Sequence, residues 1–274
     1  MTQPKLKDVN PEHPHLPLGE VERAEIEALA RRQRQAGGVL MKAVNLVGNS
    51  VEDGLRVLPK PVRARIDKVA QAALLRSYDA AARTRTGEGR LGPWTALVTG
   101  DRAHKALAAV SGALGGAGGL TTALAELPLA TTIIFRAVQG VAEAHGEDPA
   151  LEETRVECLR VFGAGGAAVQ GDEGIDTAFL GARLSLAGTG INRLVARVAP
   201  RFGAVVGQKL ASQAVPILGA AAGAGTNWAF IDYYVEMAHV HFGLRRLART
   251  HGEDAVLDHF HKALVQMGPA VRTA

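Results

Sequence analysis

Apolar residues recur at helical spacing along most of this 274-residue chain. Apolar residues spaced by four share one face of a predicted helix: Val39, Ala43, Val47, Val51 and Leu55. The C-terminal part of the chain predicts two further buried faces: Ile231, Tyr234, Ala238 and Phe242, then Leu257, Phe260, Leu264 and Met267. No segment sustains the period of two that marks a half-buried strand. The pattern therefore predicts an all-α protein, folded as a single multi-helix domain.

Glycine, proline and capping residues indicate where some of these helices begin and end. A charged, helix-favouring run from Leu18 to about Gln35 meets Gly37 and Gly38, which predict its end. Asp148 followed by Pro149 predicts the start of another helix, with aspartate as the N-cap and proline in the first helical position. The predicted inward side of that helix carries Leu151, Cys158, Leu159 and Phe162.

Two Gly/Ala-rich stretches, 106–125 and 210–231, contain no charged residue. About 20 residues can span a bilayer, but these stretches hold few large apolar side chains and many glycines. Small residues at spacing four allow helices to approach closely, so we expect closely packed, buried central helices. A hairpin that inserts shallowly, or only under some conditions, into a membrane is the alternative, ahead of a permanent span.

The chain divides into a flexible N-terminal tail (1–17), a helical domain (18–267) and a short C-terminal tail (268–274). The N-terminal tail is polar and rich in proline, and it lacks the apolar core of a signal peptide. Cys158 is the only cysteine, so no disulfide forms within the chain. We expect a cytoplasmic protein, with Cys158 in its core.

Charge is unevenly distributed around a net value of +4. Residues 56–105 hold 11 bases and 4 acids, residues 143–176 hold 2 bases and 9 acids, and residues 177–231 hold no acid. The bases in the last segment are Arg183, Arg193, Arg197, Arg201 and Lys209. We favour pairing of acidic and basic segments within the fold over a basic surface that meets an anionic partner.

No catalytic signature is present, so the sequence leaves enzymatic activity undecided, and we expect no cofactor. The glycine cluster 112–119 is followed by Leu120, Thr121 and Thr122, without the lysine that a phosphate-binding Walker loop requires. The chain also lacks the Gly-x-Ser-x-Gly motif of a serine nucleophile. Helix packing is therefore the favoured role for the glycines.

One polar stripe could carry chemistry. Asp232, Glu236 and His239 share a helix face, and Glu236-x-x-His239 is half of a carboxylate-bridged di-metal motif. No second Glu-x-x-His exists, and Asp101-x-x-His104 is the nearest substitute. We therefore favour a structural stripe, in contact with water or with bases such as Arg193 and Arg197, and expect no metal.

Two long runs resemble the EcsC family. They are GALGGAGGLTTALAELPLATTIIFRAVQGVAEAHGED (112–148) and QKLASQAVPILGAAAGAGTNWAFIDYYVEMAHVHF (208–242), within a resemblance over roughly residues 40–247. Its most specific pieces are the glycine cluster before Leu127-Pro128, and Lys209, Pro216, Gly219 and Asn227. His145-Gly146 departs from the Tyr-Gly expected there, so no role is transferred to that turn.

The resemblance implies a bacterial, helical protein associated by gene neighbourhood with membrane transport and secretion. It brings no established activity and no catalytic residues. Our leading hypothesis is a non-catalytic accessory protein, peripheral on the inner membrane or on a transport or secretion component. Its expected contact residues are Arg193, Arg197, Arg201, Lys209 and Asn227.

Two alternatives remain open. One is a metal-dependent or hydrolytic enzyme that uses Asp232, Glu236 and His239. The other is non-specific nucleic-acid binding through 56–105, which rests on charge alone, so we do not expect nucleic acid as the partner.

Overall fold

The computed structural model describes residues 15–47, 72, 74–84, 119–164, 195 and 216–267. Within these residues the chain is helical apart from short turns, and they contain no strand. The described helices are α1 (Glu20–Val47), α6 (Gly119–Ala144), α7 (Glu152–Ala164), α10 (Pro216–His251) and α11 (Glu253–Gln266), with one more helical segment at 74–84. The predicted all-α fold is confirmed.

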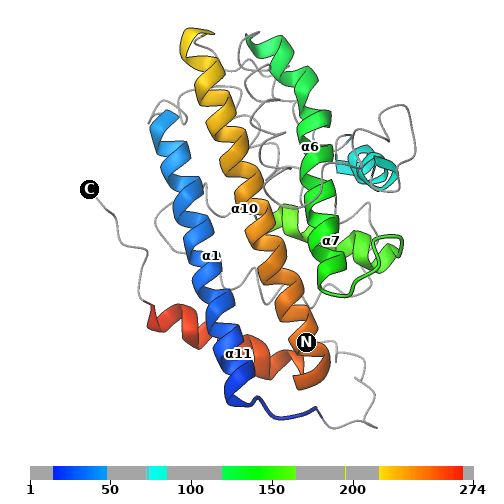
Figure 1. Ribbon diagram of the computed structural model, residues 1–274, viewed down its shortest axis with the longest axis vertical. Coiled ribbons are helices and arrows are strands. Elements are labelled where there is room, and N and C mark those ends of the chain that lie inside the picture. The colour runs from blue at the N-terminus through cyan, green and yellow to red at the C-terminus, as the bar shows by residue number, and fades with distance from the viewer. Residues whose placement is uncertain are drawn as a thin grey trace, which may run out of the picture.

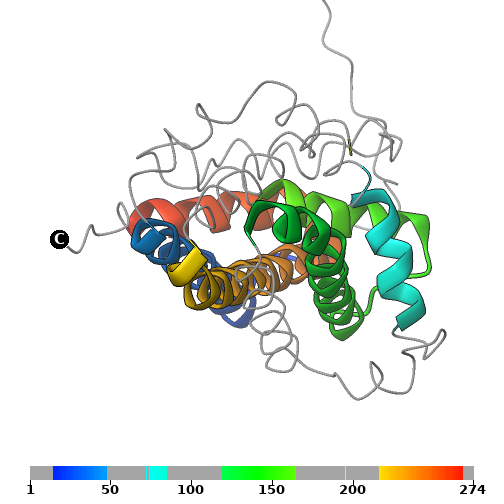
Figure 2. The ribbon, with the colours of Figure 1, turned by 90° about the horizontal axis from the view of Figure 1, so that it is seen from above.

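Helices α1, α10 and α6 lie side by side with α10 in the middle (Figure 1). Helices α7 and α11 cross one face of this layer, and the 74–84 segment lies beyond α6, on the side away from α1 (Figure 2). Helices α6 and α10 run in the same direction, whereas α1 runs in the opposite one (Figure 1). Two ion pairs confirm that α1 and α10 are antiparallel, since Arg32 pairs with Glu236 and Glu25 pairs with Arg246.

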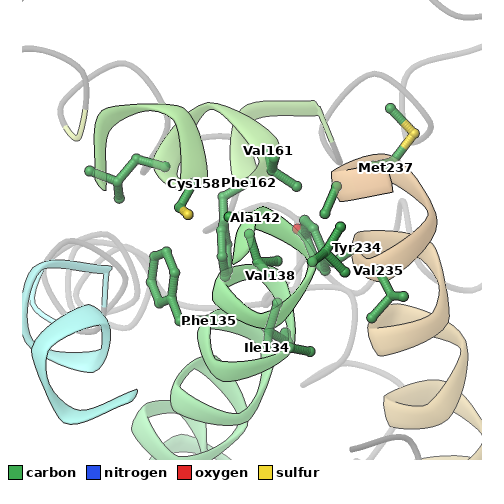
Figure 3. Close-up of a cluster of buried hydrophobic side chains, with 14 of the residues drawn as sticks. Ile134, Phe135, Val138, Ala142, Cys158, Val161, Phe162, Tyr234, Val235 and Met237 are labelled. Atoms are coloured by element: carbon green, nitrogen blue, oxygen red, sulfur yellow. The ribbon is translucent and has the colours of Figure 1, made fainter. Parts of the chain in front are cut away.

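The larger core lies where α6, α7 and α10 meet (Figure 3). Its centre is aromatic: the ring of Phe162 lies 4.2 Å from that of Phe135 and 4.8 Å from that of Tyr234. Cys158 is fully buried beside these rings, as predicted. Tyr78 joins the 74–84 segment to this core, because its ring packs edge-on against Phe135 at 5.4 Å.

A second core joins α1, α10 and α11. The predicted inward face of α11 is confirmed for Leu257, Phe260 and Leu264, while Met267 is half-buried at its edge. Where α1 crosses α10, a Cβ added to Gly243 would lie 3.0 Å from both terminal methyl carbons of Leu29. The glycine therefore sets the close approach of the two helices at this point.

The predicted break at Gly37 and Gly38 is wrong, because α1 continues through both residues to Val47. Each glycine costs a helix about 1 kcal/mol relative to alanine, which weakens a helix without ending it. Packing of α1 against the neighbouring helix α10 outweighs that local preference.

The predicted start of α7 is also wrong, since the helix begins at Glu152 rather than at Pro149. The Asp148 side chain instead accepts a hydrogen bond of 2.9 Å from the backbone N–H of Ala150, which closes a turn before the helix. Leu151 lies in that turn and is 55% exposed, so its predicted inward position is wrong.

Candidate functional site

Helix α10 carries polar side chains on two opposite faces, and the sequence predicts only one of them. The predicted face holds Asp232, Glu236 and His239, which are all half-buried. Arg245 marks the other face, because it follows Glu236 by nine residues, or about two and a half helical turns. The two faces meet different parts of the protein, and each is described in turn.

The Glu236 carboxylate is paired with Arg32 of α1. The guanidinium Nε of Arg32 donates to Oε2 of Glu236, and its NH2 group donates to Oε1 at 3.3 Å. The structure therefore gives this part of the stripe a helix-pairing contact. The described partner is Arg32, and the predicted partners Arg193 and Arg197 lie outside the described residues, so their contact with the stripe stays a prediction.

His239 meets a second histidine. Its Nδ1 lies 3.2 Å from Nε2 of His145, which directly follows α6, and the two rings are inclined by 71°. Burial lowers the pKa of His145, and the neighbouring His239 and Arg246 lower it further, against the opposite effect of Glu25. His145 therefore favours the neutral imidazole, which suits an N–H···N contact between the rings.

The stripe does not assemble a metal centre within the part of the chain whose side chains are described. No group of three or more His, Cys, Asp and Glu residues there could hold a metal ion. Glu236 is engaged with Arg32, and the two imidazoles contact each other. Asp101 and His104, the nearest substitute for a second half-motif, lie outside the described residues.

The opposite face of α10 carries a buried ion network centred on Glu157 of α7. His241 donates from Nε2 to Oε2 of Glu157 at 2.7 Å, and Arg160 donates to Oε1 at 2.8 Å. Arg245 donates to the same carboxylate at 3.3 Å and to Glu147 at 3.0 Å. One carboxylate therefore accepts from three basic side chains on two helices.

Arg249 and Glu153 extend the network towards the protein surface. Arg249 donates to Glu147 at 2.6 Å, and the third guanidinium nitrogen of Arg245 donates to Glu153. The side chain of Glu153 is 70% exposed, in contrast to 6% for Glu147. The network thus extends from the interior to the surface at the end of α10 where the 145–151 turn and α7 lie.

Opposing effects act on the pKa of Glu157. Burial alone would raise the pKa, but the hydrogen bond from His241 and the charges of His241, Arg160 and Arg245 lower it below the ordinary glutamate value. The carboxylate is therefore ionised and well supplied with donors, as a buried charge requires. With 4% of Glu157 and 3% of His241 exposed, this acid–base pair does not reach solvent. The pair attaches α7 to α10, and Glu147 attaches the 145–151 turn to α10 through Arg245 and Arg249.

The sequence analysis did not predict this network, because charged residues on a helix are ordinarily assigned to its solvent-facing side. A usable signal was nevertheless present. His241, Arg245 and Arg249 follow one another at spacing four on α10, and Glu153 and Glu157 do so on α7. A basic stripe of three residues and an acidic stripe of two indicate two helices that pair by charge.

A third feature is the segregation of charge along the three-helix layer. Because α1 is antiparallel to α6 and α10, the segments 38–47, 119–135 and 216–231 lie at the same end, the upper end in Figure 1. Lys42 and Glu126 are the only charged residues of these three segments. The remaining parts of the same helices have a similar total length and contain 15 charged residues. We call the three segments the charge-poor end.

The two uncharged stretches of the sequence run into this end. The 106–125 stretch reaches the first turns of α6, and the 210–231 stretch includes the first sixteen residues of α10. In the part of the chain that the structure describes, no helix combines the length and the apolar character needed to cross a membrane.

Of the five predicted contact residues, only Asn227 lies in the described part of this end. Asn227 belongs to the α10 segment of the charge-poor end, although the orientation of its side chain lies outside the description. Arg193, Arg197, Arg201 and Lys209 lie outside the described residues, so their predicted role stays a prediction.

Comparison with known proteins assigns a family to this arrangement. A model of the EcsC protein family matches residues 40–247, which is most of the chain. The chain belongs to the EcsC family. No curated protein and no solved structure gives a significant match.

The EcsC region contains most, but not all, of the polar contacts described above. Glu157, His241 and Arg245 fall within it, as do His145 and His239. The N-terminal part of α1, which carries Arg32, precedes the EcsC match, and helix α11 follows it. His145 marks the position where the chain departs from the Tyr-Gly expected of the family, and here its ring contacts His239.

Proposed function

We propose that this EcsC-family protein is a non-catalytic accessory protein that associates peripherally with the bacterial inner membrane. The observation that carries the proposal is the charge-poor end. Three neighbouring helices, distant in sequence, direct their charge-poor segments to one end of the bundle. A lipid surface is the partner whose chemistry suits the exposed side chains described in these segments, which are Pro128, Leu129 and Trp228.

The energetic reason is the cost of bringing charges into contact with acyl chains. A charged side chain at the bilayer centre costs about 2.5 to 3.5 kcal/mol on insertion scales, whereas each large apolar side chain gains only about 0.3 to 0.6 kcal/mol. A few charges therefore decide which end of a bundle can approach lipid. The charge-poor end carries two charged residues, against 15 in the rest of the same helices.

The described polar contacts support the non-catalytic part of the proposal. Glu236 is bound by Arg32, and Glu157 is bound by His241, Arg160 and Arg245. Groups that act on a substrate need access to it and a free coordination or hydrogen-bonding position. Each of these groups instead joins one helix to another.

The acid-free basic segment adds an electrostatic contribution to the same proposal. Arg193, Arg197, Arg201 and Lys209 precede α10 in the sequence, next to the uncharged 210–231 stretch. Basic residues near a membrane gain about 1 kcal/mol each from anionic lipids, and this attraction decreases with salt. Binding should therefore favour anionic over zwitterionic vesicles.

Vesicle flotation tests the proposal. The full-length protein is mixed with vesicles of phosphatidylglycerol and phosphatidylcholine, or of phosphatidylcholine alone, and centrifuged through a density gradient at low and at high salt. We expect the protein to float with the anionic vesicles at low salt, and less so with the neutral ones. Protein that stays at the bottom of the gradient with both kinds of vesicle would refute direct lipid association.

A further inference from the structure

We infer that the charge-poor end inserts shallowly and end-on into a lipid surface, with Trp228 of α10 at the headgroup level. The inference rests on the proposed function, since it names the contact surface of that same association. It adds an orientation and a depth, which follow from the position of one exposed aromatic side chain and two charges.

Trp228 is 42% exposed, and it is the one aromatic residue among the exposed large hydrophobic side chains of the described part. It lies twelve residues after Pro216, where α10 begins, or about 18 Å along the helix axis. Asp232 follows one turn later and is the first charged residue of α10. Trp228 thus marks the border between the charge-poor and the charged part of the helix.

Tryptophan is favoured at such a border when the surface is a membrane. Its ring is large and apolar, but its indole N–H needs a polar partner, so tryptophan concentrates at the level of the lipid headgroups. A partially exposed tryptophan in water leaves apolar surface hydrated, and this cost is removed when the ring enters the interface. The position of Trp228 therefore matches a lipid surface.

Glu126 limits how deeply the end can enter. It lies seven residues after Gly119, which begins α6, so about 10 Å of that helix precedes the first charge. Amphipathic segments at membrane surfaces typically bury about 5 to 10 Å. Because α6 and α10 begin at a similar level (Figure 1), entry to the full depth of about 10 Å, at which Glu126 reaches the acyl boundary, leaves Trp228 about 8 Å outside the acyl region. The headgroup layer extends about 5 to 8 Å beyond the hydrocarbon, so the ring reaches its outer part.

The opposite end of the bundle has a different character. Helix α11 crosses it, and the ion network of Glu157 and the pair of Arg246 and Glu25 lie in the charged parts of the layer (Figure 1). Exposed aliphatic residues occur there too, among the charged residues of the same helices: Val21 on α1 is 77% exposed, and Val265 on α11 is 75% exposed. Isolated exposed aliphatic residues are ordinary on protein surfaces. Val265 therefore supplies a matched control position away from the proposed contact.

The first test measures the depth of Trp228 directly. The chain has two tryptophans, so Trp94→Phe leaves Trp228 as the only tryptophan fluorophore. This variant is added to anionic vesicles whose acyl chains are brominated near the headgroup or near the chain end. We expect a blue shift on binding, and stronger quenching by bromine near the headgroup than by bromine near the chain end.

The second test changes the contact. Trp228→Lys should weaken partition into anionic vesicles by about threefold or more, because the burial lost with a large, partly exposed aromatic side chain exceeds the attraction that one new lysine gains from anionic lipid. Val265→Lys adds the same charge at the control position and should leave partition unchanged. Far-ultraviolet circular dichroism and thermal unfolding verify that each variant folds. The quenching measurement keeps the inference testable if Trp228→Lys does not fold.

The outcomes separate this inference from the function on which it rests. Flotation with vesicles, without quenching of Trp228 and with equal partition of the two lysine variants, would refute the orientation and leave lipid association intact. No flotation with any vesicle would refute both. Binding to native membranes but not to protein-free vesicles would show that a membrane protein occupies this surface, and it would refute lipid as the partner.

Discussion

Glu157 and His241 lie 2.7 Å apart, carboxylate Oε2 to ring Nε2, although 84 residues separate them in the sequence. Both side chains are almost fully buried, at 4% and 3% exposure. Their contact attaches α7 to α10 beside the aromatic core. An ionised carboxylate in this position needs every one of its donors, so the contact is a sensitive point of the fold.

Replacing Glu157 should destabilise the protein strongly. Glu157→Gln removes the charge that compensates Arg160 and Arg245, and loss of a buried charge partner costs about 3 kcal/mol. Glu153→Gln is the matched control, since Glu153 also accepts from Arg245 but is 70% exposed, and it should cost about 0.5 kcal/mol. Urea unfolding measures both free energies. Equal losses would show that burial does not set the strength of the network.

Acidification should lower stability in two separate pH ranges. His145 has a folded-state pKa below its ordinary value of 6.5, so the unfolded chain binds more protons than the folded one below that pH. The free energy of unfolding then decreases as pH falls from 6.5 towards the folded-state pKa. Glu157 also has a lowered pKa, so its contribution is present above 4.5 and is lost as pH falls through its folded-state value.

Urea unfolding between pH 7.5 and 4 separates these two contributions. His145→Asn should flatten the decrease just below pH 6.5, relative to the natural chain, because this position no longer takes up a proton on unfolding. Glu157→Gln should flatten the decrease below pH 4.5, in a series extended to about pH 3. The account of His145 would be wrong if His145→Asn followed the natural chain through the upper range.

Gly252 should be intolerant of a side chain. It precedes α11 with φ 85° and ψ 143°, a conformation that residues other than glycine rarely adopt, and an added Cβ would lie 3.0 Å from the ring of His15. Gly252→Ala should therefore cost about 2 to 3 kcal/mol. Gly37→Ala is the control, since an added Cβ there meets nothing within 4 Å in a helix, and it should gain about 0.5 to 1 kcal/mol. Thermal unfolding distinguishes the two, and similar shifts would contradict the account.

The Arg32–Glu236 pair should couple α1 to α10. A double-mutant cycle with Arg32→Ala and Glu236→Ala should give a coupling energy of about 1 kcal/mol, because the contact is two-pronged and part-buried. The pair of Lys262 and Asp258 on α11 is the control, since both side chains are mainly exposed, and its coupling should be about 0.3 to 0.5 kcal/mol. A coupling near zero for Arg32 and Glu236 would leave the predicted stripe without its structural role.

Periodicity was sufficient to predict the buried faces of α10 and α11, whereas the predicted face from Val39 to Leu55 lies outside the residues whose side chains are described. Ile231, Tyr234, Ala238 and Phe242 are all buried, because side chains at these spacings must face the same neighbour. Helix ends were harder to predict. Packing carries α1 through Gly37 and Gly38, and a local Asp148 turn delays the start of α7, so tertiary and local contacts override simple signals.

The polar contacts followed less directly from the sequence. Spacing placed Glu236 and His239 on one helix face. It could not identify their partners Arg32 and His145, because the sequence does not show which parts of the chain become neighbours in the fold. The same holds for Glu157 and His241. The charge-poor end could be recognised only from the sequence and the structure together. The sequence shows two uncharged stretches, and the directions of the helices place these stretches at one end of the layer.

Membrane fractionation of native cells tests the central proposal most directly. The membrane pellet from cells that produce the full-length protein at its natural level is washed with high salt and then with alkaline carbonate, and the protein is followed by antibody. We expect the protein in the membrane pellet and its release by these washes, as for a peripheral protein. Recovery of the protein entirely in the soluble fraction would contradict membrane association.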